Sequence, residues 1–208
     1  MVVNGKPSGT ALLSSAYFAP IQWYQKLWRF DRCIIERYDH FIKQTYRNRC
    51  LIATTQGTQA LTVPIEKPTT EKCLMRDLRI STHGKWQQEH WNALLSAYGE
   101  SPFYDYYIDD LRQFFEKKWD FLVDFNLAIT ETVCQLLDIQ PDIALSDTFV
   151  QEANNDFREV IRPKHPLPDP DFQPKPYYQV YQNKHGFIDN LSILDLLFNM
   201  GPEGVFYL

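Results

Sequence analysis

The sequence has few of the features that place a protein in a membrane or in an oxidising compartment. No stretch approaches the roughly 18 consecutive apolar residues of a membrane-spanning helix, and the first residues lack the basic and apolar regions of a signal peptide. The four cysteines lie far apart and form no Cys-x-x-Cys pair, which is typical of reduced thiols. We therefore expect a soluble, cytoplasmic protein without a membrane span.

The sequence also lacks an excess of basic residues. Its 21 lysines and arginines are outnumbered by 26 aspartates and glutamates, and the formal net charge is −5. Because basic residues are what holds a nucleic-acid backbone, we expect no nucleic-acid partner. Aromatic residues, by contrast, make up 15% of the chain and suit both a core and the wall of a binding pocket.

Short motifs that identify common catalytic and phosphate-binding sites are absent. The sequence contains no G-x-x-x-x-G-K-[S/T], G-x-G-x-x-G, G-x-S-x-G or H-E-x-x-H pattern. The five histidines are scattered without the spacing of metal ligands on a helix. We therefore predict no metal site, and the sequence identifies no cofactor.

The hydrophobic pattern predicts strands interleaved with helices in the first 80 residues, then a helical middle. Strands are expected at residues 11–19, 33–35, 50–54, 59–65 and 78–80, of which 50–54 and 59–65 form a β-hairpin. Helices are expected at residues 21–30, 82–98, 121–138 and 190–200, with a further helix after Ser101 and Pro102. This order predicts a single α/β domain over residues 1–208, a three-layer sandwich with a mixed sheet, with α+β as the alternative.

A proline-rich segment interrupts the second half of the chain. Six of the 13 prolines lie within residues 163–176, where they remove amide donors and keep the backbone extended. We predict a loop or lid there, without a helix or a strand.

Arg47 and Arg49 stand two residues apart, just before the first arm of the predicted hairpin. In an extended segment, side chains at this spacing point to the same side, so both guanidinium groups can grip a phosphate or a carboxylate. Charged side chains also protect a solvated strand edge from aggregation. The pair is therefore either an anion site or a strand edge.

Three further residues are candidates for catalysis. His90, four residues after Trp86 on a predicted helix, is either a general acid or base or a partly buried residue with a satisfied ring nitrogen. His185 precedes a glycine in the segment Asn-Lys-His-Gly-Phe, which predicts a turn, either close to a ligand or on the surface. Asp195 lies on a narrow polar stripe of an apolar helix; if buried, it needs a partner such as arginine or histidine, and otherwise it faces water.

Read together, these stretches resemble the WbqC-like family of bacterial proteins. The resemblance rests on landmarks at residues 17–21, 46–49, 61–65, 86–91, 96–99, 102–104, 124–127, 185–187 and 190–199. The family is named after a protein of an O-antigen gene cluster. The resemblance implies a transferase that moves an acyl or aminoacyl group, glycine, onto a sugar or nucleotide sugar in surface polysaccharide biosynthesis. Residues 163–176 depart from longer members of the family.

The resemblance also implies that the candidate residues share one site. The predicted catalytic residues are His90, His185 and Asp195, and the predicted substrate-binding residues are Tyr17, Gln44, Tyr46, Arg47, Asn48, Arg49 and Trp86. The arginines would hold an anionic small molecule or nucleotide sugar, while a histidine moves a proton. Cys50 is the alternative nucleophile, with a thiol pKa lowered by the arginines.

Two other hypotheses stay open. The order strand, Tyr-Phe-Ala-Pro, helix, strand resembles the start of Rossmann-type nucleotidyltransferases, although their paired histidines are absent. The aromatic content instead favours a non-enzymatic protein that binds a carbohydrate or a lipid-linked intermediate. The oligomeric state is not indicated by the sequence.

Overall fold

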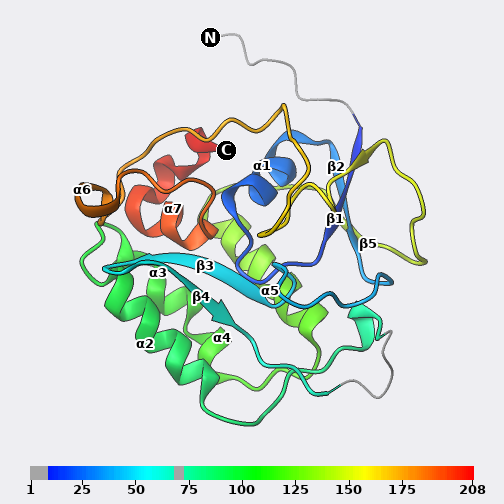
Figure 1. The fold of residues 1–208 in the computed structure, drawn as a ribbon, viewed down its shortest axis with the longest axis horizontal. Coiled ribbons are helices and arrows are strands. Elements are labelled where there is room, and N and C mark those ends of the chain that lie inside the picture. The colour runs from blue at the N-terminus through cyan, green and yellow to red at the C-terminus, as the bar shows by residue number, and fades with distance from the viewer. Residues whose placement is uncertain (1–8, 68–72) are drawn as a thin grey trace.

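A computed structural model describes residues 9–67 and 73–208 of the chain. Its centre is a parallel sheet of four strands in the order β5-β2-β1-β6 (Figure 1). The strands are β1 (Thr10–Ser14), β2 (Arg32–Glu36), β5 (Ile143–Leu145) and β6 (Asn155–Asp156). β1 and β2 read as apolar runs because both faces of a central parallel strand are covered, and Ala11, Leu12 and Leu13 are almost fully buried.

Helix α1 (Ile21–Arg29) connects β1 to β2. It begins directly after Pro20, whose fixed backbone suits the residue before a helix, and it ends at Phe30. Most of its residues are buried, including the polar Gln22, Gln25 and Lys26. Burial of these three side chains means that α1 is covered on more than its sheet-facing side.

A separate antiparallel hairpin consists of β3 (Arg49–Thr54) and β4 (Gly57–Thr62). The predicted hairpin is therefore confirmed, and so is the mixed α/β class. The expected mixed sheet is wrong, because the parallel and antiparallel pairs among the described residues belong to two separate sheets. Within this hairpin, β3 packs against the helices α2 (Trp86–Tyr98) and α7 (Ile193–Met200). The three-layer arrangement stays a prediction.

The helical middle follows the predicted stripes with shifted ends. It comprises α2 (Trp86–Tyr98), α3 (Tyr104–Leu111), α4 (Gln113–Glu116) and α5 (Leu122–Leu136). Figure 1 shows α5 between the parallel sheet and the group formed by α2, α3 and α4. Two short 3-10 helices, η1 (Met75–Asp77) and η2 (Gly201–Tyr207), and the helices α6 (Gln182–His185) and α7 (Ile193–Met200) complete the described elements.

The end of α7 requires a glycine. Ser192 caps the start of the helix, because its hydroxyl accepts a hydrogen bond from the backbone N–H of Leu194. At the other end, Gly201 has a φ of +55°, and a Cβ there would lie 2.5 Å from the ring of Phe103. Any other residue would therefore strain the backbone and collide with that ring.

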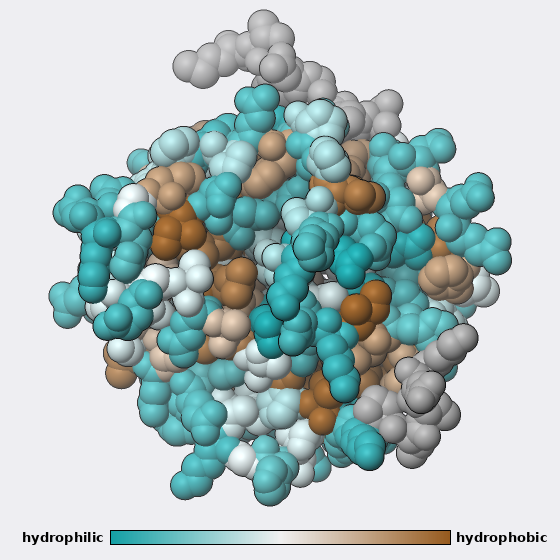
Figure 2. Space-filling view, viewed as in Figure 1, coloured by the Kyte–Doolittle hydropathy of each residue, from teal (hydrophilic) through white to brown (hydrophobic). Residues whose placement is uncertain are grey.

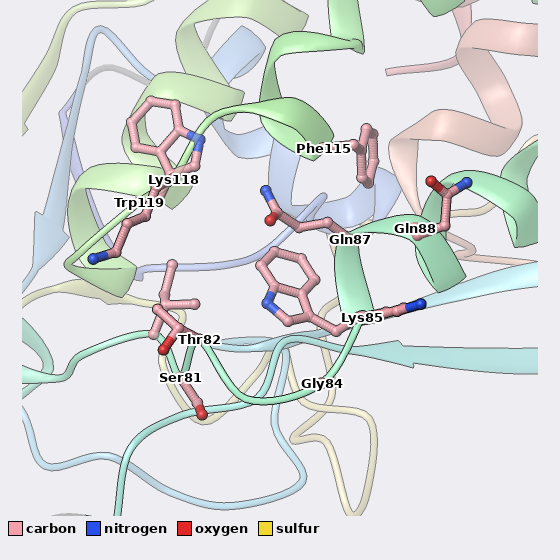
Figure 3. Close-up of a pocket in the computed structure, with 11 residues that line it drawn as sticks. Ser81, Thr82, Gly84, Lys85, Gln87, Gln88, Phe115, Lys118 and Trp119 are labelled. Atoms are coloured by element: carbon pink, nitrogen blue, oxygen red, sulfur yellow. The ribbon is translucent and has the colours of Figure 1, made fainter.

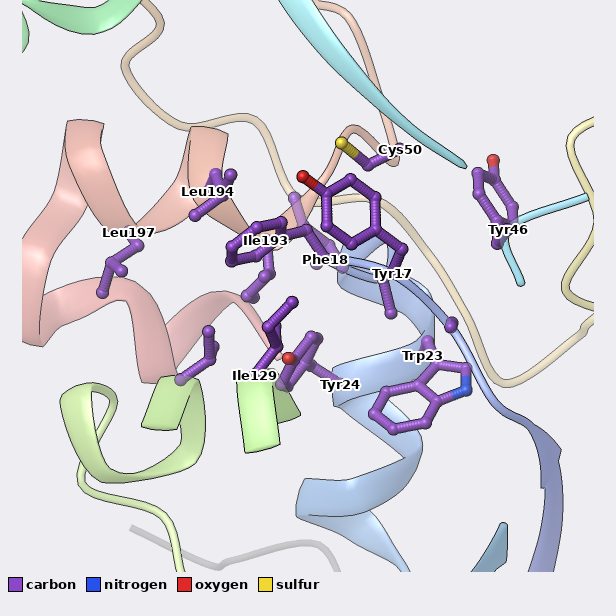
Figure 4. Close-up of a cluster of buried hydrophobic side chains, with 14 of the residues drawn as sticks. Tyr17, Phe18, Trp23, Tyr24, Tyr46, Cys50, Ile129, Ile193, Leu194 and Leu197 are labelled. Carbon is purple, nitrogen blue, oxygen red and sulfur yellow. The ribbon is translucent and has the colours of Figure 1, made fainter. Parts of the chain in front are cut away.

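The buried apolar side chains form one cluster that draws on both sheets and on α1, α2, α5 and α7. Figure 4 shows part of it, where Tyr17 and Phe18 meet α7 residues such as Ile193 and Leu194. Single apolar side chains remain exposed, and Figure 2 shows a mostly hydrophilic face with small, separate hydrophobic patches. Of the described helices, none is both long and apolar enough to cross a membrane.

The proline-rich residues 163–176 contain no helix or strand, as predicted. They lie against the outer side of α1. The fully buried Lys26 pairs its ammonium group with the carboxylate of Asp169 at 2.6 Å, and Gln22 donates to the same carboxylate at 2.8 Å. Gln25 and Arg29 donate to the backbone carbonyl of Asp171. This segment thus covers the polar side of α1 and explains why that side is buried.

Candidate functional site

The carboxyl ends of the parallel strands meet at one edge of the sheet, which we call the carboxyl edge. β1 ends there at Ser14, β2 at Glu36 and β6 at Asp156. The chain passes from β1 to β2 and β5 on one side, and β6 then pairs with the opposite side of β1. Open α/β sheets bind ligands outside such a point of reversal, because the loops on its two sides diverge.

Arg47 lies at this edge and is only 4% exposed. Its guanidinium group forms an ion pair with the buried carboxylate of Asp39, and its Nη1 donates to the Thr45 hydroxyl at 3.4 Å. Within the described residues its Nε–H has no acceptor, and Asp39 Oδ1 has no donor. Burial raises the pKa of Asp39, and the charge of Arg47 opposes this rise.

Asn126 on α5 fixes the backbone of Arg47. Its side-chain amide donates to the carbonyl oxygen of Arg47 at 2.8 Å and to the hydroxyl of Ser15 at 2.9 Å. One residue of α5 thereby ties the Arg47 segment to the end of β1. The backbone of Arg47 is therefore held by a contact with a packed helix.

A small cavity adjoins Arg47, and we call it the Arg47 cavity. Its volume of about 10 Å³ has room for roughly one water molecule. It is lined by Ser14, Ser15, Ala16, Trp23, Thr45, Tyr46, Arg47, Phe157 and Ile161. The hydroxyl of Ser14 also lacks a partner among the described residues, so the cavity is bordered by two unsatisfied polar side chains.

A second arginine acts on the same edge. Glu36 is fully buried, and its carboxylate accepts hydrogen bonds from the Ser146 hydroxyl at 2.6 Å and from the backbone N–H of Val150 at 2.8 Å. Arg158 lies 3.6 Å from this carboxylate and binds Asp156 through two of its nitrogens. The charge of Arg158 also reaches Asp39, where it opposes the rise in pKa. Arg158 was not predicted from the sequence, because the strand that places it, β6, is only two residues long.

Arg49 does not join Arg47. β3 begins at Arg49, so the two residues do not share one extended strand. Arg49 donates through Nε to the hydroxyl of Thr62, its partner in the hairpin, at 3.0 Å. The expected clamp of these two arginines is therefore not formed in the structure, where each guanidinium group has its own partner.

The other predicted substrate-binding residues are distributed around Arg47. Tyr46 lines the Arg47 cavity. Asn48 instead donates to the carbonyl oxygen of Val63 at 2.8 Å, and the exposed Gln44 accepts from the ammonium group of Lys164 at 2.8 Å. Of these three, only Tyr46 borders the cavity.

His90, Tyr17 and Trp86 are brought together in the core. The Tyr17 hydroxyl and His90 Nδ1 are 2.9 Å apart, and the rings of His90 and Trp86 have centroids 5.2 Å apart. His90 is 5% exposed, and burial lowers its pKa to about 4. The backbone N–H of Tyr17 donates to the carbonyl of Tyr46 at 2.9 Å, which ties this group to the residue next to Arg47.

Asp195 and His185 lie elsewhere. The fully buried Asp195 accepts hydrogen bonds from the hydroxyls of Tyr98 at 3.0 Å and Tyr177 at 2.6 Å, and from the Gln179 amide at 2.8 Å. Its expected arginine or histidine partner is thus replaced by three neutral donors. His185 ends α6, and its Nε2 lies 3.3 Å from the carbonyl oxygen of Thr55 at the hairpin turn. Because β3 separates that turn from Arg47, the two residues lie at opposite ends of the hairpin (Figure 1).

Cys50 is not activated. The residue is fully buried beside Tyr17 (Figure 4), and burial raises the pKa of its thiol to about 12. The lowered pKa that two nearby arginines were expected to cause is therefore contradicted. A thiol with this pKa stays protonated near neutral pH and is a poor nucleophile.

The strand order and the buried polar edge define an α/β protein with a candidate anion site at the carboxyl ends of its parallel strands. The WbqC-like protein family model matches residues 15–163, and the chain belongs to this family. The chain is also 27% identical over 225 residues to the uncharacterized protein Rv1507c of Mycobacterium tuberculosis (strain ATCC 25618 / H37Rv), across 95% of this chain and 96% of that protein. No solved structure matches the chain.

Proposed function

We propose that this chain is a transferase that holds the anionic group of a donor or acceptor at Arg47 and moves an acyl or aminoacyl group to a sugar or nucleotide sugar. The observation that carries the proposal is the Nε–H of Arg47, which has no acceptor in the described part of the chain, although the residue is 4% exposed and lines a cavity at the carboxyl edge. An unpaired donor on a buried cation is costly, and a carboxylate or phosphate oxygen is its natural acceptor. The chain belongs to the WbqC-like protein family, and the resemblance to that family implies transfer of an acyl or aminoacyl group, with glycine as the group.

The Arg47 cavity has room for roughly one water molecule, so the anionic group enters only when its cover opens. Phe157 and Ile161, which follow β6, supply apolar cover and are preceded by a strand of only two residues. Few backbone hydrogen bonds hold such a strand, and low local stability is what a moving cover requires. We assign the opening movement to this segment.

The reaction breaks the bond between the acyl carbon and its leaving group and joins that carbon to a sugar hydroxyl or amine. The leaving group keeps the electron pair, and the attacking group gives up one proton. Of the predicted catalytic residues, His90 is tied to the Arg47 segment through Tyr17, so we assign it the role of proton acceptor. Its pKa of about 4 keeps it neutral at pH 7, as an acceptor must be, although it makes the imidazole a weak base.

The test is a thermal-shift screen against nucleotides, nucleotide sugars and amino acids. A ligand at a concentration of about 100 times its Kd stabilises the folded protein by about 2.7 kcal/mol, which raises the Tm of a chain of this size by about 5–10 °C. The Arg47→Lys variant keeps a cation beside Asp39 but lacks the Nε donor, and it should lose most of this shift. Arg49→Gln, a matched control on the hairpin, should keep it.

Two results would contradict the proposal. Equal shifts in wild type and Arg47→Lys would remove Arg47 from the site, and a shift lost only in Arg49→Gln would place the anion on the hairpin. For a ligand that binds, His90→Gln should retain binding and lose turnover. Binding without turnover in the wild type, with every donor and acceptor tested, would support a non-enzymatic binding protein instead.

A further inference from the structure

A groove runs between the hairpin of β3 and β4 and the helix α2, and we call it the β4 groove. Its volume is about 840 Å³, and it shares no residue with the Arg47 cavity. It is also separate from the pocket at the start of α2, which Figure 3 shows with Lys118 and Trp119 on one side and Phe115 on the other. The α2 wall of the groove is a single face of the helix, because its residues recur at i, i+3, i+4, i+7 and i+8: Glu89, Asn92, Ala93, Ser96 and Ala97.

The groove borders the outer edge of β4. In an antiparallel pair, residues that exchange backbone hydrogen bonds with the partner strand alternate with residues whose N–H and C=O groups point away from it. The N–H of Val63, just after β4, donates to the carbonyl of Asn48 at 2.8 Å, so the register turns the backbone groups of Thr58 and Ala60 away from β3. Thr58 and Ala60 lie on one face of the strand and Gln59 on the other, yet all three line the groove. The groove therefore follows the edge of β4 and not one of its faces.

This edge is unpaired and unprotected. Within the described residues, β4 pairs with β3 alone, and the backbone N–H and C=O groups of Thr58 and Ala60 make no hydrogen bond. Edge strands usually carry a charged residue, a proline or a bulge that prevents pairing with another chain. β4 contains no charged residue and no proline, and its register with β3 is unbroken from Gly57 to Thr62. Residues 58–60 are exposed, so another strand has access to them.

Both walls of the groove are held at the end near the hairpin turn. The hydroxyl of Tyr181 donates to the carbonyl oxygen of Ala97 at 2.9 Å, and the ammonium group of Lys184 donates to the carbonyl oxygen of Thr55 at 2.6 Å. The segment around α6 thus joins the end of α2 to the turn. Because the walls are held in advance, a ligand does not have to order them, which lowers the cost of binding.

Glu89 gives the groove its charge. Of the side chains that line the groove, that of Glu89 alone is charged; it is exposed and has no ion-pair or hydrogen-bond partner among the described residues. A basic side chain is the natural partner of such a carboxylate. The β4 strand of a second copy of this chain would bring no basic residue, and the groove has no aromatic ring on which a sugar could pack. The groove therefore favours a basic peptide over a second copy and over a glycan.

We infer that the β4 groove binds an extended segment of another protein, which adds a third strand beside β4 and places a lysine or arginine opposite Glu89. The backbone N–H and C=O groups of Thr58 and Ala60 supply the hydrogen bonds to this strand. The short side chains of Ala93 and Ser96 leave room for the side chains of the added strand. The interaction uses none of the residues of the Arg47 cavity and does not depend on the proposed transfer reaction.

Selection of peptides on the full chain tests the inference. The probe is a phage-displayed library of random peptides long enough to span the groove, and the selected sequences are synthesised and titrated by fluorescence anisotropy. We expect peptides that alternate β-branched residues with other residues and contain a lysine or arginine. The absence of any selected peptide with measurable affinity would overturn the inference. So would binding of a linear glucose oligosaccharide, titrated in parallel, in place of the peptides.

A proline on β4 locates the site. Ala60→Pro removes an N–H that no described residue uses, and an edge strand tolerates proline at such a position, so the hairpin should still form. Peptide affinity should fall by at least about ten-fold, because a backbone hydrogen bond is lost and the proline ring obstructs the added strand. The matched variant Ala60→Thr keeps the N–H and should retain binding. Equal affinities of Ala60→Pro and the wild type would overturn the inference.

Peptide variants decide the question if Ala60→Pro does not fold. N-methylation at alternate peptide positions should abolish binding, whereas the intervening positions should tolerate it, and tolerance at every position would overturn the inference. Glu89→Gln should weaken binding of a basic peptide about three-fold, and Glu100→Gln, at an exposed position outside the groove, should not. Equal effects of these two variants would refute the role of Glu89. Loss of peptide binding in Arg47→Lys would place the peptide at the Arg47 cavity and would likewise overturn the inference.

Discussion

Asp195 is a fully buried carboxylate that three neutral donors hold, and the Tyr177 hydroxyl makes the shortest of the three hydrogen bonds, at 2.6 Å. Burial raises the pKa of Asp195, and the three hydrogen bonds oppose that rise. In the Tyr177→Phe variant the ring remains and one bond to a charged acceptor is lost, which costs about 2 kcal/mol. For a chain of this length the expected fall in Tm is about 4–8 °C.

The free energy of unfolding that the Tyr177→Phe variant loses should depend on pH. A carboxyl group whose pKa is raised by folding stabilises the folded state fully below its unfolded pKa of about 3.9, and this contribution is lost as the pH rises through the folded pKa. Removing the Tyr177 hydroxyl raises the Asp195 pKa further. The variant should therefore be destabilised more at high pH than at low pH. We expect a destabilisation of about 2 kcal/mol at pH 8 and about 1 kcal/mol near pH 4, where the carboxyl is protonated and its hydrogen bond is neutral.

Urea unfolding at both pH values measures these free energies. Tyr104→Phe is the matched control, because Tyr104 is 4% exposed and its hydroxyl makes no hydrogen bond to a described residue. The control should change stability by less than about 0.5 kcal/mol at either pH. The same loss at both pH values for Tyr177→Phe would refute an ionised Asp195 in the folded protein, and an equal loss in the control would refute the role of the hydroxyl bond.

Two further predictions concern buried charge. Because folding lowers the pKa of His90 to about 4, stability should fall between about pH 6.5 and about pH 4, by as much as about 3 kcal/mol, and His90→Gln should flatten this profile in urea unfolding. An unchanged profile would contradict burial of the neutral imidazole. Asp169→Asn leaves the ammonium of the fully buried Lys26 without its partner and should cost about 3–5 kcal/mol, whereas the double variant Lys26→Met/Asp169→Leu should cost less. Equal losses of stability in the single and double variants would show that the unpaired charge of Lys26 does not cause the destabilisation.

Long periodic elements were predicted from the sequence more reliably than short ones. The helix predicted at 121–138 is α5 (Leu122–Leu136), and the two predicted arms of the hairpin are β3 and β4. β6 was missed because its two residues are both polar, and β5, a run of three residues, was also not predicted. The helix predicted from residue 82 begins at Trp86, because Gly84 has a φ of +81° that no helix contains.

The candidate site was predictable only in part, because contacts between segments that are distant in the sequence complete it. Arg47 could be singled out as a basic residue beside a strand, but Arg158, which shares its edge, is far from it in the sequence. Only the pairing of β6 with β1 brings Arg158 to that edge. In the same way, Lys26 reads as an exposed residue of an amphipathic helix, and its burial depends on Asp169 in a segment without periodic structure.

The contrast between satisfied and unsatisfied polar groups separates structural from functional candidates. Both carboxylate oxygens of Asp195 have donors, so its burial needs no ligand to explain it. Within the described residues, the Nε–H of the buried Arg47 lacks an acceptor. Departures from local rules are expected where a ligand supplies the missing contact. The residue to test first is therefore Arg47, whose Nε–H lacks an acceptor among the described residues, and not Asp195, the most completely bonded of the predicted catalytic residues.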